Sequence, residues 1–86
     1  MGILSKLGMS TDLVNGMAER LRAGIPDLIA RDPQRYAPMM RTMAIRCSGC
    51  SAQANCRSLQ ARSSRLDAAP MYCVNKTALD ALRRRR

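Results

Sequence analysis

The sequence contains no histidine, phenylalanine or tryptophan, and only Tyr36 and Tyr72 are aromatic among its 86 residues. The core must therefore be packed by aliphatic side chains and seven methionines. Methionine specifies a core poorly because its side chain is flexible, and a chain of this length buries a small share of its surface. We therefore expect an added constraint, such as a bound metal, a disulfide or a partner subunit.

The sequence also lacks the motifs of common enzymes. Histidine, the commonest general base, is absent. None of the six acidic residues pairs with another at helical spacing: Asp27 and Asp32 bracket a turn, while Asp67 and Asp80 stand alone. No glycine-rich phosphate loop and no serine-nucleophile motif is present. We therefore expect no enzyme activity, since catalysis would have to use a thiol or a metal centre.

Long apolar runs are missing as well. No stretch approaches the about 20 apolar residues that cross a membrane. Residues 1–12 hold one lysine, a short broken apolar run and an early acid, which does not match a secretory signal. We therefore expect a cytoplasmic protein without a membrane span. Thiols stay reduced in the cytoplasm, which argues against disulfides.

Positive charge is present in excess. Lysine and arginine number 15 against six acidic residues, which gives a net charge of +9. This balance suits nucleic acid, an acidic protein partner or an anionic cofactor. The scarcity of aromatic side chains weighs against base stacking. The candidate contacts to nucleic acid or another anion are Arg57, Arg62, Arg65, Arg83, Arg84, Arg85 and Arg86.

Apolar residues recur at helical spacing, and no stretch alternates with period two. We therefore expect an all-α fold, a small bundle of about four short helices in a single domain over residues 1–86. The first helix would start from a cap within residues 10–12 and stop at Gly24 and Pro26. Its core face would consist of Leu13, Val14, Met17, Ala18 and Leu21.

Proline, glycine and polar caps bound the later elements. Pro38 suits a first helical turn, and residues 39–43 carry a methionine stripe that is either core or a surface for a partner helix. Residues 83–86, all arginine, are expected to form a disordered basic tail. The expected elements are a brief turn at 27–31 and helices over 38–49, over 51–66 and from Asn75 onward.

Four cysteines follow the spacing C-x2-C-x5-C-x16-C, at Cys47, Cys50, Cys56 and Cys73. A helix end, a glycine turn and a helix start would aim the first three at one point, and a returning loop would bring the fourth. Buried apolar filler and disulfides are the alternatives, and a thioredoxin-like pair lacks its βαβ context. A four-cysteine metal centre that joins the last three helices is the preferred interpretation.

The distribution of the cysteines bears on the metal. Structural zinc sites commonly use two pairs of ligands, whereas iron–sulfur sites often cluster three cysteines and add a remote fourth. Arg46 and Arg57 flank the cluster and would offset a centre of net negative charge. The spacing therefore favours an iron–sulfur cluster of the 4Fe-4S type over one zinc ion.

These residues resemble a domain-of-unknown-function family of small proteobacterial proteins. The resemblance covers roughly the second half of the chain and implies that the cysteines act as a set, but it implies no activity or cofactor. Val74 stands where the family often has proline, and Leu59 where an aromatic residue is common. The matching positions are Arg46, Cys47, Gly49, Cys50, Cys56, Pro70, Cys73 and Asn75.

The sequence thus predicts a small cysteine-ligated metal-binding protein with a redox, sensing or adaptor role. The alternative is a basic module that binds nucleic acid or protein and whose cysteines are structural. A structural zinc ion would act mainly in folding, whereas an iron–sulfur cluster would permit redox chemistry or oxygen sensing.

Overall fold

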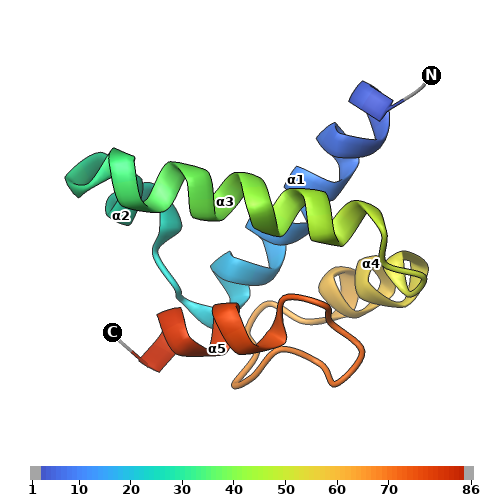
Figure 1. Cartoon of the computed structure of the whole chain (residues 1–86). Helices are drawn as coiled ribbons and strands as arrows, with labels where there is room; N and C mark the ends of the chain where they lie inside the picture. Colours follow the sequence, from blue (N-terminus) through green and yellow to red (C-terminus); the bar gives the residue numbers. More distant parts are fainter. Residues whose placement is uncertain (1–2, 85–86) are drawn as a thin grey trace.

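A computed structural model describes residues 3–84 of the chain, and all regular structure within them is helical. The expected all-α class is therefore confirmed. Figure 1 shows α3 crossing α1, α4 following the end of α3, and α5 beside the last turns of α1. The five helices are α1 (Ile3–Leu21), α2 (Ile25–Arg31), α3 (Pro33–Ser48), α4 (Gln53–Arg62) and α5 (Lys76–Arg84). About four were expected, and the brief turn of helix predicted at 27–31 is present as α2, which begins two residues earlier at Ile25.

Helix α1 is the centre of the fold. It contacts each of the other four helices, and α2 packs additionally on α3. All five residues of its predicted core face are buried. Buried apolar side chains from α3 and α5 complete the same core, among them Met43, Cys47, Leu79 and Leu82. The helical periodicity therefore identified the central element and the side that it buries.

The start of α1 differs from the prediction. Ser10, Thr11 and Asp12 were expected to cap the helix, but the helix begins at Ile3 and includes them. The Thr11 hydroxyl donates to the carbonyl of Leu7 one turn earlier, at 2.8 Å. Ser10 is fully buried and its hydroxyl accepts a hydrogen bond from Gln53 in α4. Ser10 therefore joins two helices, and the prediction that it caps the start of a helix was wrong.

The bounds of α3 and α4 also differ. α3 begins at Pro33 instead of Pro38, because either proline tolerates the first helical turn, where no backbone donor is needed. Pro38 therefore lies inside the helix. α4 begins two residues after Ser51 and ends at Arg62, because Ser63 is extended with φ −131° and ψ 122°. Leu66 lies beyond that helix, and its amide donates to the Arg20 carbonyl at 2.9 Å.

The last helix includes part of the expected tail. Arg83 and Arg84 are the final residues of α5, and residues 85–86 lie outside the described part of the chain. Arg83 lies 3.9 Å from the carboxylate of Asp67. Among the described residues, no helix combines the length and the apolar character that crossing a membrane requires.

Candidate metal centre

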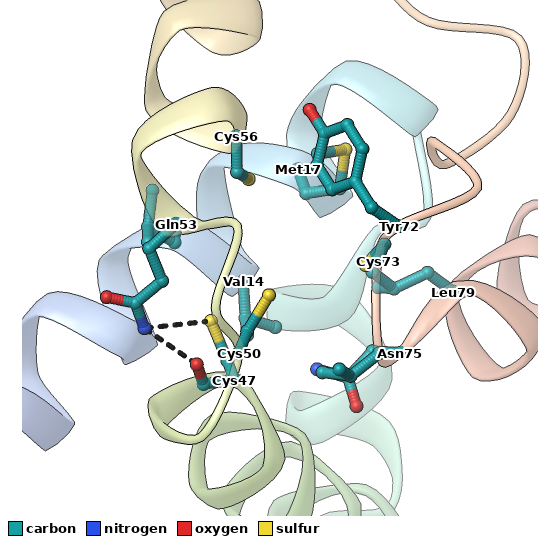
Figure 2. Close-up of a pocket in the computed structure, with 12 residues that line it drawn as sticks. Val14, Met17, Cys47, Cys50, Gln53, Cys56, Tyr72, Cys73, Asn75 and Leu79 are labelled. Atoms are coloured by element: carbon teal, nitrogen blue, oxygen red, sulfur yellow. Dashed lines mark hydrogen bonds between the residues drawn. The ribbon is translucent and has the colours of Figure 1, made fainter.

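All four cysteines line one pocket, although they come from four separate segments. Cys47 lies in the last turn of α3, Cys50 in the turn that follows, Cys56 near the start of α4, and Cys73 in the loop before α5. Figure 2 shows them around a common space against α1. Leu13, Val14 and Met17 of α1 form the apolar wall of this pocket. None of the four thiols forms a disulfide.

The turn between α3 and α4 places two of these thiols. The Gly49 amide donates to the Arg46 carbonyl at 3.1 Å, and the Cys50 amide donates to the Cys47 carbonyl at 3.0 Å. The chain thus reverses within a few residues and α4 begins at Gln53. Glycine after the helix end was the signal for this turn, and the expected placement of Cys47 and Cys50 is confirmed.

A second turn places Cys73. Its amide donates to the Pro70 carbonyl at 3.0 Å, and its own carbonyl accepts from the Lys76 amide at 3.1 Å. The loop is tied to α5 because the Ala69 amide donates to the Asp80 carboxylate at 2.9 Å. The remote cysteine is therefore held beside the other three by turn and side-chain hydrogen bonds.

Three of the four sulfur atoms accept a hydrogen bond from an N–H group. The backbone amide of Ala52 donates to Cys50 at 3.3 Å, and the Asn75 backbone acts on Cys73 by lowering its pKa. Side-chain amides donate to the other two, from Gln53 to Cys47 at 3.8 Å and from Gln60 to Cys56 at 3.3 Å. For Cys47 and Cys73, the hydrogen-bond donors lower the pKa of the thiol and so favour the thiolate.

Burial of the thiols and repulsion between the cysteines instead raise the pKa of Cys47 and Cys73. Burial raises the pKa of the Cys47 thiol above its ordinary value, and negative charge on Cys56 and Cys50 would raise that pKa further. Burial likewise raises the pKa of Cys73, with the same repulsion from the other three cysteines. Four thiolates in this pocket therefore need a cation among them, because bound metal charge reverses this repulsion.

The thiols surround the pocket without converging on a single point. Within residues 3–84, no three cysteine or acidic side chains are grouped so as to hold one metal ion. The free space inside the pocket is about 20 Å³, enough for about one water molecule. The predicted cysteine centre therefore stays a prediction, although the structure brings its four residues to one pocket.

The candidate arginines do not form one surface. Arg57 and Arg62 are exposed on α4, and Arg65 is exposed in the loop after it. Arg83 and Arg84 end α5 on the opposite side of the molecule in Figure 1. Arg85 and Arg86 lie outside the described residues.

Sequence reasoning missed the polar residues that support the cysteines. Gln53 and Gln60 stand three residues before and four residues after Cys56, so all three share one face of α4. Arg20 reaches from α1 to the carbonyls of Gln60 and Ser63 at 2.8 and 2.7 Å. The shared helical face was the only signal of this arrangement in the sequence.

The fold and the pocket define a small helical protein with four free cysteines around one apolar pocket. The chain belongs to a family of unknown function (DUF6455), which matches residues 1–85. A family of unknown function was expected from the second half of the chain, and the match covers nearly the whole chain. No curated protein and no solved structure matches the chain.

Proposed function

We propose that this chain is a small iron–sulfur protein in which Cys47, Cys50, Cys56 and Cys73 ligate one 4Fe-4S cluster. One observation carries the proposal: four free thiols from four segments surround one pocket, and three of the sulfur atoms accept N–H hydrogen bonds. Buried apolar filler would not require such donors. Donors of this kind are the usual support of metal-ligating side chains.

The arrangement favours a cluster over a single zinc ion. A tetrahedral zinc site needs four sulfur atoms at about 2.3 Å from one point, whereas the four thiols come to the pocket from four separate segments. A cubane cluster binds each thiolate at a different iron atom, so its ligands stand around a wider object. The three-plus-one spacing of the cysteines supports the same choice.

Uptake of a cluster requires the pocket to widen beyond its about 20 Å³. Tyr72 and Val74 line the pocket from the loop before α5 and are 39% and 47% exposed. We propose that these two side chains move outward when a cluster binds, while the buried residues Ala69 and Asn75 keep their places in the core.

The surrounding charge suits an anionic centre. Segment 33–66 supplies three of the four cysteines and contains six arginines but no acidic residue. Arg57 and Arg62 are exposed on the helix that carries Cys56. When bound, a cluster supplies one-electron redox chemistry. The apolar wall of Leu13, Val14 and Met17 limits water beside it. We therefore propose a redox or sensing role without enzyme activity.

Anaerobic purification tests this proposal directly. We expect coloured protein with broad visible absorption and with four iron and four sulfide per chain. Cys73→Ser should lower the iron content strongly, whereas Ser58→Ala, an exposed serine of α4, should leave it unchanged. Colourless protein that carries one equivalent of zinc would overturn the cluster. Full iron content in Cys73→Ser would remove Cys73 from the ligands.

Nucleic-acid binding is a second candidate, because Arg57, Arg62 and Arg65 are exposed in a region without acids. Phosphate contacts would make the affinity fall steeply with salt. Binding to DNA and RNA oligonucleotides at low and moderate ionic strength tests it, with the triple substitution of these arginines by glutamine. Absence of salt-sensitive binding at low ionic strength would contradict this candidate.

A further inference from the structure

Helix α4 combines a partly buried apolar face with polar contacts to α1. None of its ten residues is fully buried, although Cys56 and Leu59 pack against the core. Gln53 reaches α1 by donating to the Ser10 hydroxyl at 3.1 Å, and Gln60 does so by donating to the Leu13 carbonyl at 2.9 Å. Two amide side chains thus add specific hydrogen bonds to the packing of this helix.

The Gln60 amide has a fixed orientation. Its Nε2 group donates both to the Leu13 carbonyl at 2.9 Å and to the Cys56 sulfur at 3.3 Å. Both of its hydrogens are therefore used, one toward α1 and one toward the sulfur. Its backbone carbonyl is fixed as well, because it accepts from Arg20 Nη2 at 2.8 Å.

Gly16 makes room for this side chain. A Cβ atom at position 16 would overlap Oε1 of Gln60. Glycine inside a helix is unfavourable by itself, and Gly16 lies within α1. The Gly16 carbonyl also accepts from Arg20 Nη1 at 2.9 Å, so the same arginine contacts both residues of the pair.

We infer that Gln60 is a positioning residue that fixes the Cys56 thiolate and raises the reduction potential of the centre, with Gly16 providing the space that it needs. This inference rests on the proposed function. An N–H donor to a ligating sulfur stabilises added negative charge, so it favours the reduced state. Removal of the donor should therefore lower the potential.

Gln60→Met tests the donor, because methionine has a similar length and no N–H group. We expect unchanged iron content. The equilibrium constant for reduction should fall about tenfold, which for one electron corresponds to a reduction potential lower by about 59 mV. Gly16→Ala keeps the amide but displaces it, and should lower the potential in the same direction. Gln34→Met, at an exposed glutamine of α3, is the matched control and should leave the potential unchanged.

A second measurement needs no cluster. In the metal-free protein, NMR should show the Gln60 side-chain amide shifted from its free position and slow to exchange, and Gly16→Ala should move that signal but not the Gln34 signal. A Gln60 amide at the free position, or an unchanged potential in iron-replete Gln60→Met, would overturn the inference. Wild-type protein that forms no cluster, with the Gln60 signal as expected, would instead overturn the proposed function and leave the positioning of Gln60 standing.

Discussion

The two sides of α1 are held by different kinds of contact. Its apolar side, formed by Val14, Met17, Ala18 and Leu21, is buried in the shared core of α3 and α5. Its polar side, formed by Gly16 and Arg20, faces α4, and Arg20 donates to the carbonyls of Gln60 and Ser63. The apolar side gives stability, because burial is the main favourable term in folding. The polar side fixes α4, which carries Cys56.

The largest effect is expected on the apolar side. Leu21 is 1% exposed, so Leu21→Ala should leave a cavity and cost about 2–5 kcal/mol of unfolding free energy. Urea denaturation of the metal-free protein measures this loss. Ile45→Ala is the control, because Ile45 is 55% exposed and its truncation should change stability by less than about 0.5 kcal/mol. Equal losses in both variants would contradict the assigned core.

The next effect is expected on the polar side. Arg20→Met removes the guanidinium that donates to the carbonyls of Gln60 and Ser63. Hydrogen bonds from a charged donor contribute about 1.5–3 kcal/mol, so we expect a loss of that size and weaker amide protection in α4. Hydrogen exchange locates the change, and Arg41→Met, at an exposed site on α3, is the control. Uniform loss of protection across α1 and α3 would show that α4 is not a separately held element.

A smaller effect is expected where the cysteine loop joins α5. The Lys76 ammonium donates to the Ala69 carbonyl at 2.7 Å and lies 2.9 Å from the Asp80 carboxylate. Its side chain is 31% exposed, so solvent weakens the ion pair. Lys76→Met should cost about 0.5–1.5 kcal/mol, whereas Lys6→Met, exposed on α1, should be nearly neutral. The urea midpoints of the two variants test this prediction, and equal midpoints would contradict it.

The smallest effect at neutral pH concerns the thiols themselves. Burial raises the pKa of Cys47 and of Cys73 above the ordinary value of 9.0. Above pH 9 the unfolded chain loses these protons before the folded chain does, so the metal-free protein should lose stability as the pH rises. Urea midpoints at pH 7 and above pH 9 measure this. The loss should shrink in a Cys47→Ala variant, and stability that rises above pH 9 would contradict buried thiols.

The contrast between the two sides also explains what the sequence could predict. Apolar spacing revealed the buried side of α1 and the buried positions Met43, Leu79 and Leu82, because burial imposes a period on the sequence. It also placed Cys47 at a helix end followed by a glycine turn. The start of α1 was missed because Ser10, read as a local cap, makes its hydrogen bond to a distant glutamine.

The support of the candidate site was not predictable in the same way. From the sequence, Gln53 and Gln60 would be expected to face solvent. Polar residues that join two helices do not stand out from exposed polar residues in the sequence pattern. The position of Cys73 in the sequence also does not predict the path of its loop. That path depends on the turns at Pro70 and Lys76 and on the contact between Ala69 and Asp80. The cysteine pattern named the four residues of the candidate site, which line one pocket, and the tertiary structure adds the polar residues around them.

The close approach of Gly16 to Gln60 has an evolutionary consequence. Because a Cβ atom at position 16 overlaps the Gln60 amide, a residue larger than glycine at position 16 requires the side chain at position 60 to move or to be shorter. Relatives with alanine or a larger residue at position 16 should carry a shorter side chain at position 60, and relatives that retain the glutamine should retain the glycine. The pair is thus expected to appear as a coupled substitution across the family.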